Sequence, residues 1–312
     1  GGFTTTLTFT LENLGNVPLS NVQLVDDLTD SFPTPAQFSV AALSSTDLSV
    51  NTNYNGSNIT ELLLGSDTLA VGASATISLD LTFRPNGLAG PFNNQAVGSG
   101  LGPSGRSTSD LSTNGTDPDL NDNSNPSDPD EELSTPLIFT PNPVIGVAKS
   151  ADPTRDNGDG SFTSMMTFTL ENLGNVVLSN VQLVDDLTAT FPTPAQVSVT
   201  NLSSAGLSVN PAYNGTTNTN LLSGTDTLGI GATATLSVDI VFRPNGLAGP
   251  FNNQAIASAQ GPGGQPTSDL SHAGTEPDPN GDGDPSIPEE DNPTVISFAS
   301  NPVIGIAKSV TE

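Results

Sequence analysis

Two acidic segments contain the residues whose types and spacing could do chemistry, and that chemistry is the binding of a hard cation. In the later segment, D-P-N-G-D-G-x5-E places side-chain oxygens at alternate positions of a loop, with a glycine at the sixth. This is the pattern of the twelve-residue calcium loop, in which the oxygens converge on the ion and the glycine permits a sharp turn. Oxygen donors without cysteine favour calcium over a transition metal. The predicted ligands are Asp278, Asn280, Asp282, Asp284 and Glu289.

The earlier acidic segment keeps the same offsets, but Ser124 stands where the later one has glycine. A lower affinity or a different geometry is therefore expected there. In the later segment, Pro279, Pro285 and Pro288 would break any helix beside the loop. That loop is therefore expected between β-strands and is not an EF-hand. A solvated, disordered linker is the alternative, because acidic tracts rich in Pro, Gly and Asn are often of that kind. The predicted ligands in this segment are Asp119, Asn121, Asn123 and Asp130.

A third candidate cation site is the loop DPTRDNGDG, where three carboxylates could hold an ion between repeats. The alternative is a tight turn built on Asn-Gly and Asp-Gly pairs, and both interpretations stay open. Two pairs of aspartates end a predicted strand and could add ligands, although strand-end aspartate is more often a turn former. The loop carboxylates are Asp152, Asp156 and Asp159, and the strand-end pairs are Asp26, Asp27, Asp185 and Asp186.

Composition excludes most other chemistry and several classes of partner. The chain has 6 Lys plus Arg against 33 Asp plus Glu, a net charge of -27, so nucleic acid and anionic membrane surfaces are excluded as partners. Its one histidine, His272, is Thr113 in the first copy, and we expect it to be a surface residue. With no Cys or Trp and two Tyr, thiol chemistry and glycoside hydrolysis are not expected. We therefore predict that the chain is not an enzyme.

The chain contains two tandem copies of one unit, which align at an offset of 159 residues without a gap. TFTLENLGN at Thr8–Asn16 returns at Thr167–Asn175, and FRPNGLAGPFNNQA at Phe83–Ala96 returns at Phe242–Ala255. The final segment, NPVIGIAKSVTE, matches the segment that leads into the second copy. The predicted organisation is a first repeat over 1–141 without its opening strand, a second repeat over 142–300, and 301–312 as the opening strand of a further repeat or a donor strand for a neighbouring chain.

Apolar and polar residues alternate over 3–11 and 74–83, and again over 162–170 and 233–242, which predicts strands with one buried face. Shorter strands are predicted at 22–25, 37–40, 48–51, 92–99, 136–140 and 144–149. The 26 Pro and 31 Gly leave no uninterrupted amphipathic helix. The predicted fold class is all-β, with two tandem immunoglobulin-like antiparallel β-sandwich repeats that carry acidic loop insertions. No apolar run is long enough to span a membrane, and no signal peptide is visible in this sequence.

The chain resembles the conserved-repeat domain (domain of unknown function, class eleven) found in tandem arrays on bacterial surface proteins. The resemblance rests on DNGDGSF, TFTLENLGNVVLSNVQLVDDL, GATATLSVDIVFRP, FNNQA and EPDPNGDGDPS, and covers essentially the whole chain. Its most specific part is N-x-G-x-x-x-L-x-N-V-x-L-x-D at Asn172–Asp185. The resemblance implies an immunoglobulin-like sandwich in an exported, often calcium-dependent stalk, adhesin or fibre. The long acidic insertion before the closing strand departs from shorter members.

The few cations have expected roles of their own. Arg84 and Arg243 recur at equivalent positions, and each is expected to form a buried or half-buried pair with a local carboxylate. Lysines on the predicted first strand and asparagines near a late strand are also the arrangement in which some surface-protein sandwiches form a Lys–Asn isopeptide bond. These residues are Lys149, Lys308, Asn93, Asn94, Asn252 and Asn253.

The expected function is that of a structural repeat in an extracellular filament, stalk or fibre on a bacterial cell surface, stiffened by Ca²⁺. The alternative is an adhesin or a module that binds a glycan or a host protein. The predicted partner is the protein itself, through neighbouring repeats or through strand addition by Pro302–Ser309. A continuous polypeptide of many repeats is the other possibility, and deletion of 301–312 would separate the two.

Overall fold

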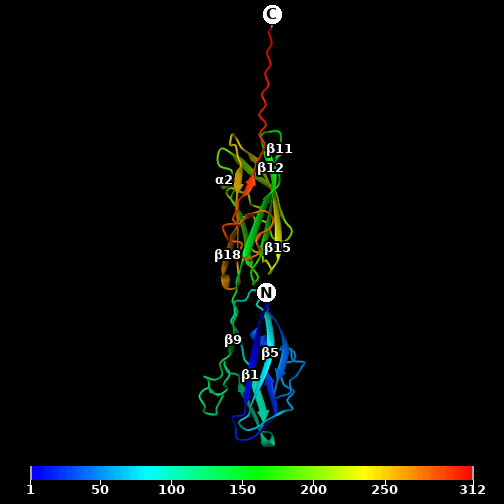
Figure 1. The fold of residues 1–312 in the computed structure, drawn as a ribbon, viewed down its shortest axis with the longest axis vertical. Coiled ribbons are helices and arrows are strands. Elements are labelled where there is room, and N and C mark those ends of the chain that lie inside the picture. The colour runs from blue at the N-terminus through cyan, green and yellow to red at the C-terminus, as the bar shows by residue number, and fades with distance from the viewer. Residues whose placement is uncertain (1, 311–312) are drawn as a thin grey trace. The chain divides into compact units, whose positions relative to one another are not determined.

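Alternating apolar and polar residues produce strands with one buried face in both copies of the repeat. The computed structural model describes residues 2–310 and divides into two units, Gly1–Pro141 (unit 1) and Asn142–Glu312 (unit 2). Both are immunoglobulin-like antiparallel β-sandwiches (Figure 1). No helix within residues 2–310 is long and apolar enough to cross a membrane.

Unit 2 is built from a large sheet that faces a smaller one. The large sheet has the order β14-β15-β12-β10-β19, with β11 on the end of β12, and the smaller has the order β13-β17-β18; a third pair joins β16 to β20. The strands are β10 (Ile145–Ala151), β11 (Arg155–Asp156), β12 (Phe162–Asn172), β13 (Ser179–Asp185), β14 (Gln196–Ser204), β15 (Thr233–Arg243), β16 (Phe251–Asn253), β17 (Ala255–Gln260), β18 (Pro266–Leu270), β19 (His272–Ala273) and β20 (Thr294–Ile296).

Unit 1 repeats this architecture, but the sheet that corresponds to the six-stranded sheet of unit 2 has only three described strands. Its sheets have the orders β1-β5-β3, β4-β2-β7-β8 and β6-β9. The strands are β1 (Phe3–Glu12), β2 (Leu19–Val25), β3 (Gln37–Ser45), β4 (Thr68–Leu69), β5 (Ser74–Arg84), β6 (Phe92–Asn94), β7 (Val97–Leu101), β8 (Ser107–Leu111) and β9 (Thr135–Leu137). In unit 2, β10 lies beside β12; in unit 1 no described strand lies on the corresponding side of β1.

Each sandwich closes over its own apolar core. In unit 2 the inward face of β15, from Leu236 to Phe242, packs against β12 and β13, and the same residue types fill the core of unit 1. A cluster of phenylalanine rings closes one end of each core, with Phe242 and Phe251 in edge contact at 5.8 Å in unit 2. Burial of these apolar side chains is the main driving force for forming each core.

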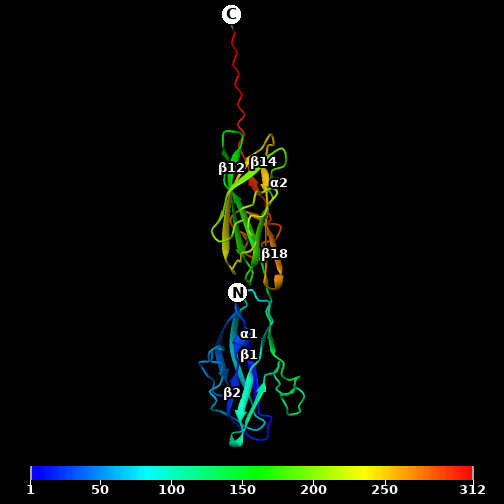
Figure 2. The same ribbon diagram turned by 180° about the vertical axis from the view of Figure 1, so that it is seen from behind.

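One-turn helices follow β2 and β13 in the two units (Figure 2). They are α1 (Leu28–Ser31) and α2 (Leu187–Thr190), and their N-caps are Asp27 and Asp186, whose side chains accept from the Thr29 and Thr188 amides. The strand predicted over 48–51 is wrong in extent: only Val50 pairs, in a single bridge to Leu63. The strand predicted over 92–99 is interrupted, because Gln95 and Ala96 separate β6 from β7.

Candidate functional site

The opening strand of unit 2 is the most completely buried strand in that unit. Strand β10 pairs antiparallel with β12 from Ile145 opposite Asn172 to Ala151 opposite Met166, and a short parallel pairing joins it to β19. Five consecutive residues, 145–149, are buried, which is the pattern of a strand covered on both faces. Strand β10 therefore closes the sandwich of unit 2.

Side chains from the opposite sheet hold the backbone of β10. The amide of Val147 donates to Asp269 Oδ2 at 2.7 Å, and the hydroxyl of Thr294 donates to the carbonyl oxygen of Lys149 at 2.8 Å. Gly146 is required by close approach, because a Cβ there would lie 2.8 Å from the Cβ of Pro277. A strand in this place therefore needs a glycine at one position and receives hydrogen bonds at fixed positions along its backbone.

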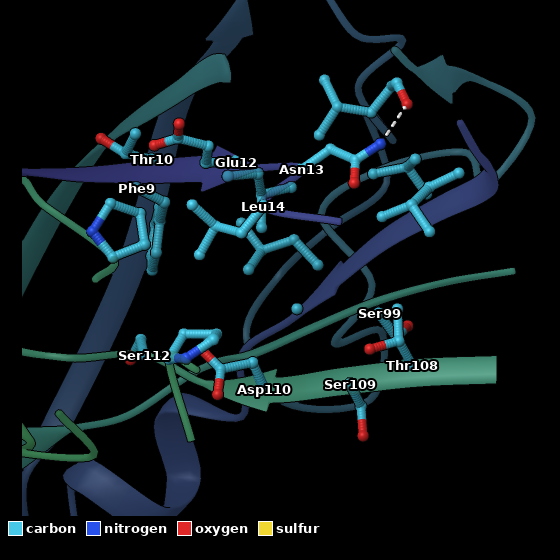
Figure 3. A pocket seen from close by; sticks show the side chains of 18 of the residues that line it. Phe9, Thr10, Glu12, Asn13, Leu14, Ser99, Thr108, Ser109, Asp110 and Ser112 are labelled. Atoms are coloured by element: carbon cyan, nitrogen blue, oxygen red, sulfur yellow. Dashed lines mark hydrogen bonds between the residues drawn. The ribbon is translucent and has the colours of Figure 1, made fainter. Parts of the chain in front are cut away.

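In unit 1 the equivalent space is an open groove (Figure 3). It has a volume of about 880 Å³ and runs along the free edge of β1, from Thr6 to Asn13. Across from this edge lie the counterparts of the groups that hold β10. Asp110 and Thr135 correspond to Asp269 and Thr294, and the groove prolines 118 and 126 correspond to those around Gly146.

The open groove leaves part of the apolar core of unit 1 uncovered. Phe9 and Leu11 are only half-buried, although their counterparts in β12 are fully buried. Val17 is 39% exposed, whereas Val176 is 3% exposed. Burial of apolar area stabilises a fold by about 25 cal/mol per Å². Unit 1 therefore presents an apolar and hydrogen-bonding surface shaped for one more strand.

The segment 301–310 carries the sequence that fills this space in unit 2. Residues 301–309 repeat residues 142–150 with one change, Ile306 in place of Val147. They form neither helix nor strand (Figure 1). All of them are exposed, with Ile304 at 96% and Ile306 at 98%. The counterparts of these two isoleucines in β10 are 1% and 0% exposed. The segment is thus apolar, unpaired and matched in sequence to the groove.

A buried lysine, aspartate and asparagine lie together where β10 meets β13 and β16. Lys149 Nζ lies 2.6 Å from Asp185 Oδ2, and both side chains are fully buried. Asn253 Nδ2 donates to the other oxygen, Oδ1, at 2.8 Å. Burial lowers the pKa of Lys149 to about 8, although the Asp185 charge opposes part of this effect. One carboxylate thus bridges a lysine amine and an asparagine amide; we call these three residues the triad.

Unit 1 contains two members of the same triad. Asn94 Nδ2 donates to Asp26 Oδ1 at 2.7 Å, while Asp26 Oδ2 is buried with no hydrogen-bond partner in the described part of the chain. Burial raises the pKa of Asp26 to about 7; the Asn94 hydrogen bond opposes this shift and the charge of Asp27 adds to it. The position of Lys149 corresponds to Lys308, in the exposed segment. Strand-end aspartates usually form turns, but Asp26 and Asp185 instead lie buried and accept hydrogen bonds from Asn94 and Asn253.

The acidic loops partly follow the predicted pattern. In unit 2 Asp278 accepts hydrogen bonds from the Gly281 and Gly283 amides, and Asn280 Oδ1 accepts from the Asp282 amide. In unit 1 Asp119 accepts from the Asn123 and Ser124 amides. The described residues contain no group of three or more His, Cys, Asp or Glu side chains placed to hold a metal ion. Calcium binding therefore stays a prediction.

A buried glutamate directly follows the last predicted ligand of each acidic loop. Asp130 and Glu289 are exposed, whereas the next residues, Glu131 and Glu290, are buried. Oε1 of Glu131 accepts from the Asn121 amide, and Oε1 of Glu290 accepts from the Asn280 amide. In the described part of the structure, Oε2 of each glutamate is buried without a partner. The sequence pattern missed both residues because the carboxylates at the twelfth positions, Asp130 and Glu289, already satisfied it.

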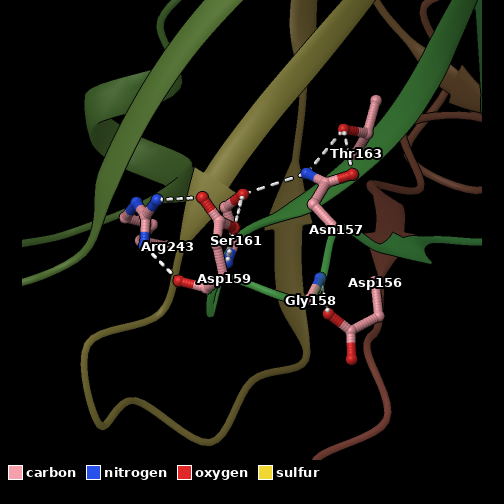
Figure 4. A network of polar contacts seen from close by, with 7 residues as sticks. All are labelled: Asp156, Asn157, Gly158, Asp159, Ser161, Thr163 and Arg243. Atoms are coloured by element: carbon pink, nitrogen blue, oxygen red, sulfur yellow. Dashed lines mark hydrogen bonds and ion pairs between the residues drawn. The ribbon is translucent and has the colours of Figure 1, made fainter.

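The loop before β12 is held by its own hydrogen bonds (Figure 4). Asp156 Oδ1 accepts from the Gly158 amide, and Asp159 Oδ1 accepts from the amide and hydroxyl of Ser161. These Ser161 hydrogen bonds lower the pKa of Asp159, with Arg243 contributing less. The third predicted carboxylate, Asp152, precedes β11, and its backbone amide donates to the carbonyl oxygen of Met165. Among the described residues its side chain forms no hydrogen bond with the other two carboxylates. This geometry fits the tight turn.

The remaining polar residues divide between confirmed and wrong predictions. Arg243 pairs with a local carboxylate, Asp159, as predicted, but the pair is not buried: the two side chains are 41% and 57% exposed. The pair predicted for Arg84 is not found: the residue is exposed, and no carboxylate within residues 2–310 forms an ion pair with it. His272 is half-buried rather than a free surface residue, because it lies in β19 and its Nδ1 is 3.0 Å from the carbonyl oxygen of Glu290.

Comparisons with known proteins give similar structures and no family. No family model matches the chain, and no curated protein matches it, so the resemblance to the conserved-repeat domain stays a prediction. The C-terminal domain of the Streptococcus agalactiae AgI/II polypeptide BspA is 14% identical, over 87% of this chain and 93% of that one, with a TM-score of 0.19. A putative membrane-anchored protein from Corynebacterium diphtheriae is 8% identical, over 99% and 91%, with 0.28. CfaE, the adhesive subunit of the Escherichia coli CFA/I fimbria, is 10% identical, over 80% and 75%, with 0.27.

Proposed function

We propose that the chain is a structural repeat of an extracellular fibre or stalk on a bacterial surface, extended by strands that pass from one sandwich to the next. The observation that carries the proposal is the match between the open groove of unit 1 and the exposed segment 301–309. Strand β10 directly follows unit 1 in the sequence and closes unit 2. The same strand sequence directly follows unit 2, where it is free to close another sandwich.

In this proposal the occupant of the groove is the segment 301–309 of a second copy of this chain. Docked in the register of β10, Ile306 lies opposite Leu11 and Lys308 lies opposite Phe9. The Ile306 amide then meets Asp110, as the Val147 amide meets Asp269 in unit 2. Gly305 passes between the groove prolines, as Gly146 does in unit 2. Because the groove and the segment are on different parts of the chain, each added copy leaves one groove and one segment free, so growth continues head to tail.

The proposal gives the chain no activity on an outside substrate and does not require a glycan ligand. Both tyrosines, Tyr54 and Tyr213, are buried in the cores, so neither offers a platform for sugar stacking. The net charge of -27 keeps the fibre away from nucleic acid and anionic lipid.

The experiment is light scattering of the purified chain over a range of concentrations, beside a variant that lacks 301–312. We expect the intact chain to form oligomers whose mean mass rises with concentration, and the truncated variant to stay monomeric. Residues 301–310 are exposed and belong to no strand, so we expect both sandwiches to stay folded without the segment. An intact chain that stays monomeric at millimolar concentration would contradict assembly by separate copies and favour a continuous polypeptide.

Calcium in the acidic loops is the second part of the proposal. The buried and unpartnered Oε2 atoms of Glu131 and Glu290 support it, because a buried charge without a partner costs several kcal/mol and a cation would remove that cost. We expect calcium to raise the melting temperature and chelator to lower it, as mass action requires for an ion that binds the folded state. Glu290→Gln should weaken binding in calorimetry, and the exposed neighbour change Glu289→Gln should not. Equal effects of both changes would place the ion elsewhere.

A further inference from the structure

The triad of unit 2 has the arrangement of an amide-transfer site. We propose that Lys149 and Asn253 become joined by an isopeptide bond whose formation is catalysed by Asp185, and that Asp26 and Asn94 form the same bond with Lys308 of a second copy. The second half rests on the proposed function, because it requires segment 301–309 in the groove of unit 1. The reaction needs no cofactor and occurs once per triad.

The geometry brings the reacting groups to one carboxylate. Asp185 Oδ2 holds the lysine nitrogen at 2.6 Å, and Oδ1 holds the amide nitrogen of Asn253 at 2.8 Å. Thr190 Oγ1 also accepts from this amide nitrogen, at 2.6 Å, and so fixes the amide. The Phe168 ring lies 4.9 Å from Lys149 Nζ and helps to keep water out. Groups held in this way react as if at very high local concentration.

Burial prepares the lysine to act as a nucleophile. A charged pair in a dry interior carries a large desolvation cost. Transfer of one proton from Lys149 Nζ to Asp185 Oδ2 neutralises both groups and removes that cost. The lowered pKa of Lys149 reflects the same burial. The neutral amine then has a free electron pair for attack on Asn253 Cγ, as in other lysine nucleophiles activated by desolvation.

Asp185 moves protons from the attacking nitrogen to the departing one. Nζ attacks Cγ and forms a tetrahedral centre; the carboxyl group passes a proton to Nδ2 and takes the second proton from Nζ. The Cγ–Nδ2 bond breaks, one ammonia leaves, and Nζ remains bonded to Cγ as an amide. Asp185 ends protonated and neutral, so the count of protons and charges closes.

The reaction also supplies a hydrogen-bond donor to the carbonyl oxygen of Asn253, which has none in the described part of the chain before the reaction. Asn253 Oδ1 is buried and has no hydrogen-bond partner within the described residues. A buried carbonyl without a donor costs about 1–3 kcal/mol. The protonated Asp185 of the product is a donor next to that oxygen. The reaction therefore replaces a buried ion pair and an unsatisfied carbonyl by a neutral, hydrogen-bonded set.

For unit 1 the residues equivalent to the triad lie in two places: the aspartate and asparagine are in the sandwich, and the lysine is on the segment 301–309. Asp26 and Asn94 stand as Asp185 and Asn253 do, and Ser31 Oγ accepts from the Asn94 amide at 3.2 Å in place of Thr190. The lysine is absent from the groove and present on the free segment. A docked second copy would place Lys308 opposite the unpartnered Asp26 Oδ2. The divided triad would turn reversible strand addition into a covalent head-to-tail link.

Intact mass of the purified chain tests the bond in unit 2. We expect a mass about 17 Da below that of the sequence, the mass of one ammonia. Lys149→Met, Asn253→Ala and the isosteric Asp185→Asn should each restore the full sequence mass, with circular dichroism showing that the β fold persists. Trypsin should leave residues 107–155 joined to 156–308, because an acylated Lys149 is not cut and Arg243 precedes a proline. A full sequence mass for the folded wild-type chain would overturn this half.

Denaturing gels and native light scattering together test the bond in unit 1. We expect the concentrated chain to form oligomers that survive boiling in detergent. Lys308→Met and Asn94→Ala should abolish these while native oligomers remain, because the strand still docks. Native oligomers that all dissociate in detergent would reject the covalent link and keep the proposed function. If oligomers fail to form in either assay, strand addition itself fails, while the mass result for unit 2 stands by itself.

Discussion

Asp185→Asn is expected to lower the melting temperature of unit 2 by roughly 6–20 °C, whereas the equivalent Asp26→Asn leaves unit 1 unchanged or more stable. Without Asp185 the bond between Lys149 and Asn253 does not form and Lys149 stays buried without its partner, and an uncompensated buried charge costs about 3–5 kcal/mol. In a domain of this size, 1 kcal/mol shifts the melting temperature by about 2–4 °C. Asp26 has no lysine beside it, so the neutral side chain removes a desolvation cost.

The stability of unit 1 should depend on pH through Asp26, and the direction of this dependence follows from the pKa of that residue. Asp26 binds its proton more tightly in the folded state, where its pKa is about 7, than in the unfolded chain, where it is about 3.9. Between these values the folded state holds more protons, so the stability of unit 1 should fall as pH rises from about 4 to about 7. Asp26→Asn should flatten this slope. Calorimetry at several pH values of the chain that ends at residue 300, which lacks Lys308, measures both transitions. Equal, same-sign effects of the two substitutions would contradict the assignment.

The second large effect is expected at the exposed segment. A peptide of residues 301–312 should bind a chain that ends at residue 300, and replacing Ile304 and Ile306 by Asp should weaken binding by about 10²–10⁴-fold. Each isoleucine buried in the groove contributes about 1.5–3 kcal/mol, so the pair contributes about 3–6 kcal/mol. Asn301→Asp is the matched control, because it adds a carboxylate at a position whose counterpart, Asn142, stays exposed.

Gly305→Val gives an independent variant of the same peptide. Nothing lies within 4 Å of Gly305 in the free segment, so the change costs nothing before docking. In the groove the new side chain would meet the prolines, as a Cβ at Gly146 would meet Pro277 at 2.8 Å. Binding that survives both the valine and the two aspartates would show that the peptide sits somewhere other than in the register of β10.

Much of the fold could be predicted from the sequence because apolar and polar residues alternate with a period of two along the long strands. The long strands β1, β5, β12 and β15 follow from this pattern and from the exact repeat of the unit. The segment 48–51 alternates as well, but its neighbours offer it only one bridge, at Val50. Pairing partners, which the local pattern does not contain, decide whether such a short run becomes a strand.

The candidate site was only partly predictable. Alternation places Val181, Leu183 and Asp185 on one face of β13, and this signal could have identified the aspartate as buried. The rule that strand-end aspartates form turns outweighed it. For Glu290, a motif that counts ligands from a fixed start cannot say which of two adjacent glutamates turns inward. The groove itself is a tertiary feature, visible only when the two copies are compared in space.

Hydrogen exchange of the chain that ends at residue 300, with and without the peptide 301–312, tests the central claim most directly. Free amides at a strand edge exchange quickly, and those that become paired exchange slowly. We predict that the peptide slows exchange along the edge of β1, at residues 6–13, and leaves the equivalent residues 165–172 of unit 2 unchanged, because β10 already covers them. Unchanged exchange at β1, or equal slowing in both units, would contradict the account.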